Sequence, residues 1–120
     1  MTALPTILLV DDETTVREVV AQMLSDSGFQ VMTASSGTDA LRIIYQRSID
    51  LLFTDIIMPG IDGVELAKRA RQVRPELKVL FATGYAQKAF ERDAIRRGRV
   101  IYKPFRREQL LAEVESALAA

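Results

Sequence analysis

The sequence predicts an α/β protein, in which a doubly wound parallel sheet of five strands is covered by helices on both faces. Short apolar runs rich in Val, Ile and Leu alternate along the chain with segments whose apolar residues recur at helical spacing. The run Leu51–Phe53 is apolar at consecutive positions, which is typical of a strand buried on both faces. Because parallel strands are joined by right-handed crossovers, the alternation favours a three-layer sandwich.

The first part of the chain contains two strand–helix pairs. Residues 6–10 are β-branched or Leu and predict a strand, and the spacing of the next apolar residues predicts a helix over residues 14–27. Gly28 provides a stop for that helix, because glycine readily adopts the left-handed conformation found at helix ends. The same two patterns recur as a strand over residues 29–34 and a helix over residues 36–47.

The central strand ends at Asp55 and is followed by the turn residues Pro59 and Gly60. Asp62 can cap the helix that comes next, since its carboxylate can accept a hydrogen bond from an amide in the first helical turn. This third helix is expected to stop before Pro75, because a residue that precedes proline is disfavoured in the helical conformation.

The last third of the chain repeats the alternation of strand and helix. Apolar residues predict a fourth strand over residues 77–82 and a short fifth strand over residues 100–102. Between these strands, a thin apolar stripe among basic residues predicts a helix over residues 87–97. Apolar residues at helical spacing from Leu110 to Leu118 predict the final helix.

The composition excludes several classes of function. With 120 residues, the chain suffices for one domain that buries about two thirds of the surface its unfolded form would expose. Sixteen basic and sixteen acidic residues balance, so we expect no direct binding of nucleic acid or membrane. The absence of Cys and His excludes thiolate chemistry and the commonest general base. No apolar run approaches the roughly 20 residues of a membrane-spanning helix, and we expect a cytoplasmic protein.

Polar residues follow four of the predicted strands at the point where each strand ends. The carboxyl ends of parallel strands meet at one edge of the sheet, so we expect these residues to lie together. They are Asp11 and Asp12 after the first strand, Asp55 at the end of the third, Thr83 after the fourth and Lys103 after the fifth. Without basic neighbours, three carboxylates would repel one another unless a cation intervened, and oxygen ligands of this kind suit Mg²⁺.

Each of these residues also has an ordinary structural interpretation. Asp12 suits the N-cap position of the helix over residues 14–27. Asp55 and Thr83 could simply begin loops, and Lys103 before a proline could be a solvated loop lysine. Chance explains poorly why all of these polar residues fall at the same edge of the sheet, which favours the functional interpretation.

Four motifs of the chain stand in a specific order and spacing. They are Leu9-Val10-Asp11-Asp12-Glu13, Thr54-Asp55-Ile56-Ile57-Met58-Pro59-Gly60-Ile61-Asp62-Gly63, Ala82-Thr83-Gly84-Tyr85 and Tyr102-Lys103-Pro104-Phe105. Together they resemble the response-regulator receiver domains of two-component signalling, over essentially the whole chain. The resemblance implies a flavodoxin-like sheet with strand order 2-1-3-4-5, as in chemotaxis-regulator-like receivers. It also implies a single receiver domain over residues 1–120 without an output domain.

The resemblance implies that Asp55 accepts a phosphoryl group from a phosphohistidine of a sensor histidine kinase or a histidine phosphotransfer protein. Lys103 and the Thr83 hydroxyl would hold phosphoryl oxygens. The chain would catalyse only its own phosphorylation and dephosphorylation, so we expect it not to be an enzyme for other substrates. Mg²⁺ is the implied cofactor, and its ligands would be Asp11, Asp12, Asp55 and the main-chain carbonyl of Ile57.

The resemblance further implies a conformational switch. Phosphorylation would draw Thr83 toward the phosphoryl group and let the aromatic ring of Tyr102 turn inward. The change would alter the face formed by the fourth helix, the fifth strand and the fifth helix, which an unknown downstream protein would recognise. The chain would be a monomer or a weak dimer. A cis peptide bond before Pro104 is also implied.

Two alternatives concern the place of the chain among its relatives. The segment after Thr83, with the basic run Arg96-Arg97-Gly98-Arg99, resembles both a subgroup of stand-alone receivers and the receiver modules of hybrid sensor kinases.

A small Mg²⁺-dependent aspartyl phosphatase is a rival from the enzyme class. Such enzymes usually carry a second Asp two residues after the nucleophile, where this chain has Ile57. A degenerate receiver that binds partners without phosphate is disfavoured by the intact set of site residues.

The lifetime of the phosphorylated state depends on the side chains that flank the path of a hydrolytic water. By position these are Ile57, two residues beyond Asp55, and Tyr85, two residues beyond Thr83. Neither is a good base near neutral pH. We therefore predict slow self-dephosphorylation, suited to a persistent signal or to back-transfer of the phosphoryl group to a kinase.

Overall fold

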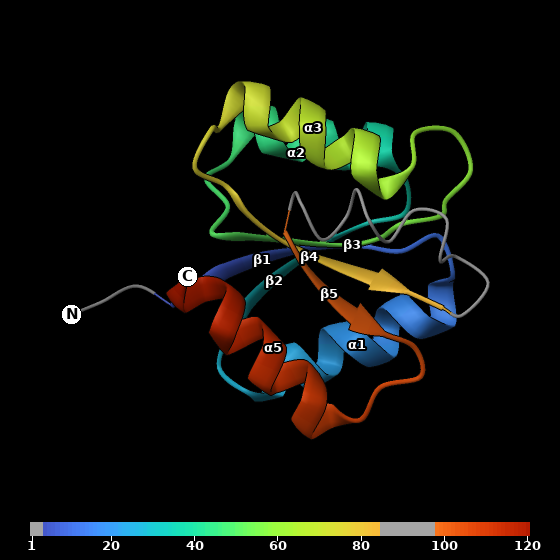
Figure 1. The fold of residues 1–120 in the computed structure, drawn as a ribbon, viewed down its shortest axis with the longest axis vertical. Helices are drawn as coiled ribbons and strands as arrows, with labels where there is room; N and C mark the ends of the chain where they lie inside the picture. The colour runs from blue at the N-terminus through green and yellow to red at the C-terminus, as the bar shows by residue number, and fades with distance from the viewer. Residues whose placement is uncertain (1–3, 85–97) are drawn as a thin grey trace.

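The computed structural model describes residues 4–84 and 98–120, and Figure 1 shows them as a three-layer sandwich. The five parallel strands have the order β2-β1-β3-β4-β5, which confirms the predicted fold class and strand order. The strands are β1 (Thr6–Val10), β2 (Gln30–Ala34), β3 (Leu51–Asp55), β4 (Lys78–Thr83) and β5 (Arg99–Tyr102). The helices are α1 (Thr14–Asp26), α2 (Gly37–Gln46), α3 (Gly63–Val73) and α5 (Arg107–Ala119). Tyr85 and the predicted helix over residues 87–97 lie outside the described residues.

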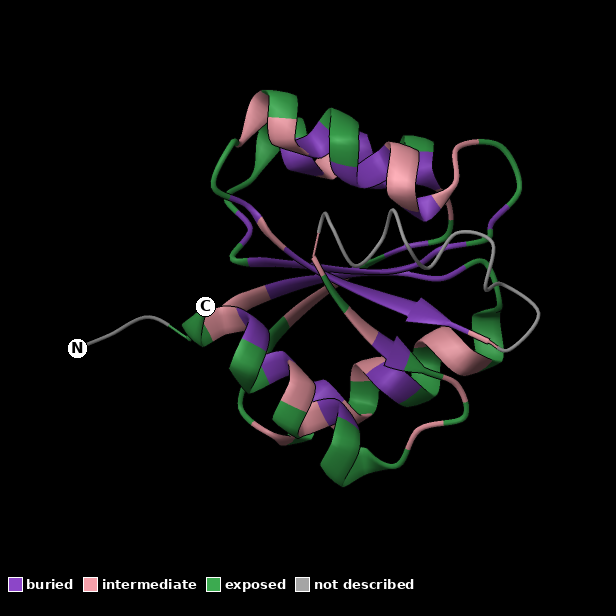
Figure 2. Cartoon of the chain, in the orientation of Figure 1, coloured by how far each residue is buried: buried purple, intermediate pink, exposed green. Residues whose placement is uncertain are grey.

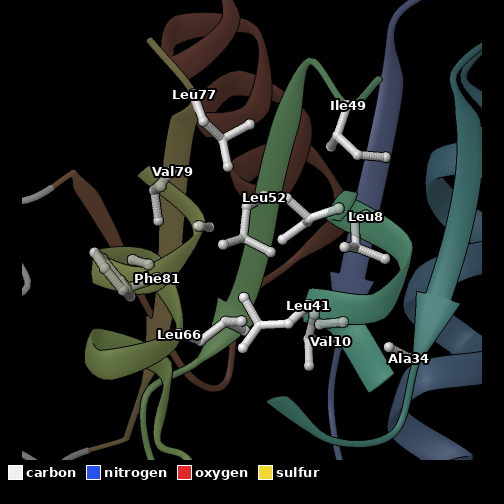
Figure 3. Close-up of a cluster of buried hydrophobic side chains, with 14 of the residues drawn as sticks. Leu8, Val10, Ala34, Leu41, Ile49, Leu52, Leu66, Leu77, Val79 and Phe81 are labelled. Carbon is white, nitrogen blue, oxygen red and sulfur yellow. The ribbon is translucent and has the colours of Figure 1, made fainter. Parts of the chain in front are cut away.

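Alternate strand residues face opposite sides of the sheet and fill two separate hydrophobic cores. One core lies between the sheet and helices α2 and α3, and Figure 3 shows Leu8, Leu52 and Phe81 among its members. The other lies between the sheet and helices α1 and α5 and includes the intervening residues Ile7 and Phe53. Every residue of β3 is buried (Figure 2), so this strand faces a core on each side, as its consecutive apolar residues predicted.

The ends of the helices carry the expected polar caps. The Asp62 carboxylate accepts a hydrogen bond from the Glu65 amide at 2.8 Å, which confirms the predicted cap of α3. The Ser36 hydroxyl accepts one from the Asp39 amide at 3.1 Å at the start of α2. Gly28, just beyond α1, has a φ of +96°, the left-handed conformation expected of a helix stop. None of the described helices is long and apolar enough to cross a membrane.

The start of α1 differs from one of the sequence interpretations. The N-cap residue of α1 is Glu13, and no side chain forms a capping hydrogen bond there. The interpretation of Asp12 as an N-cap is therefore wrong. The physical reason lies one residue earlier, because Asp11 Oδ1 accepts the hydrogen bond of the Glu13 amide at 2.9 Å and turns the chain before the helix begins.

Candidate functional site

The carboxylates predicted at the carboxyl edge of the sheet come together in the structure. Asp11 follows β1 and Asp55 ends β3, and the two residues are only 4% and 7% exposed. Asp12 is exposed beside them. One oxygen from each of the three carboxylates lies within 4.8 Å of the other two, so the group could hold a metal ion. The predicted convergence of the three acidic residues at the carboxyl edge of the sheet is confirmed.

Lys103 lies among these carboxylates. Its Nζ is 2.7 Å from Asp55 Oδ1 and 3.6 Å from Asp11 Oδ2. The premise that the carboxylates have no basic neighbour is therefore wrong, and so is the alternative of a solvated loop lysine. The cause is the length of the side chain, which reaches from the end of β5 past the intervening strand β4 to the end of β3. The Lys103–Pro104 peptide bond is cis, as the resemblance implied.

Burial dominates the protonation of Asp55. Removal of the carboxylate from water outweighs the hydrogen bond and charge of Lys103, so the pKa of Asp55 is raised from 3.8 to about 7. Burial acts to lower the pKa of Lys103, but the hydrogen bond and charge of Asp55 prevail, and this pKa is raised above its ordinary value. A divalent cation between the carboxylates would favour the ionised form of Asp55.

Two hydrogen bonds fix the loop between β1 and α1. Besides the bond between Asp11 Oδ1 and the Glu13 amide, Arg17 Nη1 donates to the main-chain carbonyl of Asp11 at 2.7 Å. Arg17 thereby ties α1 to the loop that carries two of the three carboxylates. Sequence reasoning missed this residue. The only signal in the sequence was that Arg17 is a basic residue near the start of a helix that follows an acidic pair. The same pattern also fits a solvated surface residue.

Gly63 holds the loop after β3 against the backbone of Asp55. The Gly63 amide donates to the Ile56 carbonyl at 2.6 Å. A Cβ atom at position 63 would lie 2.0 Å from the Asp55 carbonyl oxygen, far inside van der Waals contact. Only glycine therefore fits where α3 begins. Gly63 ends one of the four sequence motifs, and no role for it was predicted, although a glycine directly after the capping residue Asp62 was a signal of close approach.

The substitution Gly63→Ala is expected to lower the free energy of unfolding by about 3 kcal/mol, because the added methyl group must push α3 away from Asp55. Denaturant unfolding, followed by circular dichroism, gives the measurement. Gly84→Ala is the matched control, since no atom of residues 4–84 or 98–120 would lie within 4 Å of a Cβ atom at position 84. Equal unfolding midpoints for the two variants would contradict the close approach of Gly63.

The other predicted site residues surround the same edge of the sheet. Thr83 is 1% exposed at the end of β4, and its hydroxyl donates to the Gly84 carbonyl at 3.3 Å. The Lys103 amide donates to the Thr83 carbonyl at 2.8 Å, which joins the ends of β4 and β5. Ile57 and Tyr102 are each 43% exposed. Within the described part of the chain, no hydrogen bond to the Ile57 carbonyl is found.

Comparison with known protein families agrees with this arrangement. The family model of the response regulator receiver domain matches residues 7–115, which is most of the chain. The chain belongs to this family. Receiver domains take phosphoryl groups from kinases, and the acidic group at the sheet edge, which could bind a metal ion, lies within the matched residues.

Relatives match nearly the whole of this receiver domain. It is 38% identical over 116 residues to the response regulator receiver protein CpdR of Brucella abortus, covering 95% of this chain and 97% of that protein. It is 36% identical over 117 residues to the sensor kinase CckA of the same organism, covering 94% of this chain but 12% of the kinase. The crystal structure of a receiver domain protein from Clostridium thermocellum has a TM-score of 0.90 at 30% identity, covering 97% and 95% of the two chains.

If the three carboxylates hold Mg²⁺, replacement of Asp12 by Ala is expected to weaken its binding roughly tenfold or more, because one of the three carboxylates is lost. In metal-free buffer the same change should raise the melting temperature, since it relieves repulsion among the carboxylates and removes no helix cap. Calorimetric titration and thermal melting measure the two effects. Asp26→Ala removes an acidic residue of α1 outside this carboxylate group and is the control. A metal-free melting temperature several degrees below that of the parent would contradict the account.

Proposed function

We propose that this receiver domain accepts a phosphoryl group on Asp55 from a phosphohistidine of a sensor histidine kinase or histidine phosphotransfer protein, with Mg²⁺ as cofactor. The observation that supports this most strongly is the environment of the buried Asp55 carboxylate. It meets Lys103 at 2.7 Å and lies within 4.8 Å of two further carboxylates. An acceptor oxygen, a cationic side chain and metal ligands are thus close together, as phosphoryl transfer requires.

Four oxygen donors of the chain would hold Mg²⁺. The ion prefers oxygen ligands, and waters and phosphate oxygens usually complete its shell. The Ile57 carbonyl suits this role, because it accepts no hydrogen bond from the described residues. When bound, the ion supplies positive charge that neutralises the phosphoryl oxygens. The four oxygen donors to the ion would be the carboxylates of Asp11, Asp12 and Asp55 and the main-chain carbonyl oxygen of Ile57.

The side chains of the domain would act on the phosphoryl group directly. An oxygen of Asp55 forms the new bond to phosphorus while the phosphorus–nitrogen bond of the phosphohistidine breaks, and the donor imidazole leaves with that electron pair. Lys103 Nζ and the Thr83 hydroxyl would each hold one phosphoryl oxygen. Because the transition state of such a transfer is loose, positioning and charge supply most of the catalysis. We propose that no other substrate is turned over.

We propose that phosphorylation is transmitted from Thr83 to Tyr102. The two residues are register partners at the ends of β4 and β5. Movement of the Thr83 hydroxyl toward the phosphoryl group would open space into which the half-exposed ring of Tyr102 could turn. The altered surface of β5 and α5 would then be recognised by a downstream protein, as a shift between two packings of one domain.

Two relatives represent the two interpretations of the domain, a stand-alone receiver and a module of a hybrid sensor kinase. The match covers 97% of the receiver protein CpdR and 12% of the sensor kinase CckA. The rival aspartyl phosphatase is not favoured. The residue two positions after Asp55 is Ile57, an aliphatic side chain that cannot act as a general acid.

Incubation of the purified domain with acetyl phosphate and Mg²⁺ tests the proposed function. A phospho-accepting receiver gains the mass of one phosphoryl group at Asp55, and a metal chelator blocks the gain. A phosphatase would instead turn over the donor continuously, and a module that binds partners without phosphate would show no mass change. Either of these results would reject the proposal.

Hydrolysis of the phosphorylated domain is expected to be slow and to become roughly tenfold faster in Ile57→Asn, because an amide can hydrogen-bond the attacking water and an aliphatic side chain cannot. The decay is followed by intact mass with Mg²⁺ present. Val19→Asn makes the same change at an apolar residue of comparable exposure on α1 and is the control. A parent that decays as fast as a double variant Ile57→Asn, Tyr85→Glu would show that these side chains do not gate water.

A further inference from the structure

We infer that Thr54 is a positioning residue for the phospho-acceptor, in that its hydroxyl fixes the backbone between Asp55 and Met58. The inference rests on the proposed function. Thr54 is 0% exposed in β3, and the residues on the same face, Leu52 and Ile56, belong to the core beneath α2 and α3. A hydroxyl in such apolar surroundings is costly unless it is hydrogen-bonded. The buried Thr54 hydroxyl therefore needs a hydrogen-bond partner within the domain.

The Thr54 hydroxyl contacts both ends of the segment from Asp55 to Met58. Thr54 Oγ1 donates to the main-chain carbonyl of Asp55 at 2.9 Å, and it lies 3.9 Å from Met58 Sδ. A hydroxyl carries one hydrogen and thioether sulfur is a weak acceptor, so the carbonyl is the principal partner. Met58 is itself buried. Between these contacts lies Ile57, whose carbonyl is a proposed ligand of Mg²⁺.

Gly63 completes the restraint on the same segment. Its amide donates to the Ile56 carbonyl, and its Cα packs against the Asp55 carbonyl that Thr54 contacts. Two successive carbonyls are thus held by the domain. Because each planar peptide leaves only two soft dihedral angles per residue, fixing these carbonyls restricts where the next carbonyl can point. Loss of the Thr54 hydroxyl would let the Asp55 peptide rotate and would displace both the acceptor carboxylate and the Ile57 carbonyl.

Two variants separate the hydroxyl from the shape of the side chain. Thr54→Val keeps the shape and removes the donor, while Thr54→Ser keeps the donor and removes a methyl group. We expect Thr54→Val to bind Mg²⁺ roughly tenfold more weakly, at the lower end of what supporting contacts contribute to metal affinity. Its phosphorylation by acetyl phosphate should slow to a similar extent. Thr54→Ser should stay within about twofold of the parent in both measurements.

The control is a loss of packing in the same core. Ile44→Val lies in α2, outside the group of site residues, and removes one buried methyl group. It should melt at a lower temperature than the parent but bind Mg²⁺ with the parent's affinity. A decrease in metal affinity that follows melting temperature across all three variants would mean that Thr54 acts only through stability, and would overturn the inference.

Further outcomes are also decisive. Equal Mg²⁺ affinity in the parent and Thr54→Val overturns the inference, as does equal weakening in Thr54→Val and Thr54→Ser. If Thr54→Val does not fold, Thr54→Ala is compared with Thr54→Ser, because these differ by the hydroxyl alone, and equal affinities again overturn it. A parent that binds no Mg²⁺ and gains no phosphoryl group rejects the proposed function itself, and the inference with it.

Discussion

Asp55→Asn is expected to abolish phosphorylation by acetyl phosphate and Mg²⁺, with no mass gain detectable, while the circular dichroism spectrum remains that of the parent. The amide is nearly isosteric with the carboxylate, so the fold is kept. It lacks the anionic oxygen that would form the bond to phosphorus, and it weakens both the pairing with Lys103 and the carboxylate group that could hold a metal ion. Intact mass spectrometry after a fixed incubation measures the effect.

Asp26→Asn serves as the control for this substitution. Asp26 is an exposed residue that ends α1, and its carboxylate accepts a hydrogen bond from the Gln22 side chain. The same chemical change at this position should leave phosphorylation unaltered. A mass gain retained in Asp55→Asn and located at another residue would show that the acceptor has been misassigned.

In buffer without divalent cations, Asp55→Asn is also expected to be more stable than the parent, by an amount that grows as pH rises from about 4 to about 7. The pKa of Asp55 is raised by burial from 3.8 to about 7. The folded parent therefore binds more protons than the unfolded chain in this range, and its stability falls as pH rises. The full effect is at most on the order of 4 kcal/mol, since one pKa unit corresponds to about 1.4 kcal/mol.

Thermal melting of both proteins with a chelator, at several pH values across this range, measures the difference. Lys103 does not contribute to the slope, because its pKa is raised above its ordinary value and it stays charged throughout. Addition of Mg²⁺ should restore stability to the parent at neutral pH, since the ion favours the ionised carboxylate. A stability difference that is independent of pH would show that the folded domain does not retain the proton on Asp55.

Local signals in the sequence account for most of the architecture. The consecutive apolar residues of Leu51–Phe53 indicated a strand buried on both faces, and β3 is wholly buried. Asp62 was identified as a cap from its residue type and place, and it makes the expected bond. The strand ends placed three carboxylates at one edge, because the edge follows from parallel topology alone. These features need no knowledge of contacts between distant segments.

Some features that the sequence did not reveal depend on contacts between distant segments, and others depend on the exact path of a loop. Lys103 pairs with Asp11, ninety-two positions earlier in the chain, and the reach of its side chain across β4 becomes evident only in the folded sheet. The role of Gly63 depends on the exact distance between a helix start and a strand end. Asp12 suited a cap by residue type, but the path of the loop gave the Glu13 amide to Asp11. Residue type alone cannot distinguish these outcomes.

The close approach of Gly63 to the Asp55 backbone also limits the direction in which the site around Asp55 can expand. α3 begins in contact with the Asp55 backbone, so this side has no free space to be compressed. On the other side, Asp55 pairs with Ala82 of β4 and contacts Lys103, which follows β5. Lys103 and the neighbouring Thr83 have side chains that can rotate about single bonds. The volume of an added phosphoryl group would therefore be accommodated toward β4 and β5. α3 would act as a fixed wall, and the displacement would be directed away from it toward the β5 edge of the sheet.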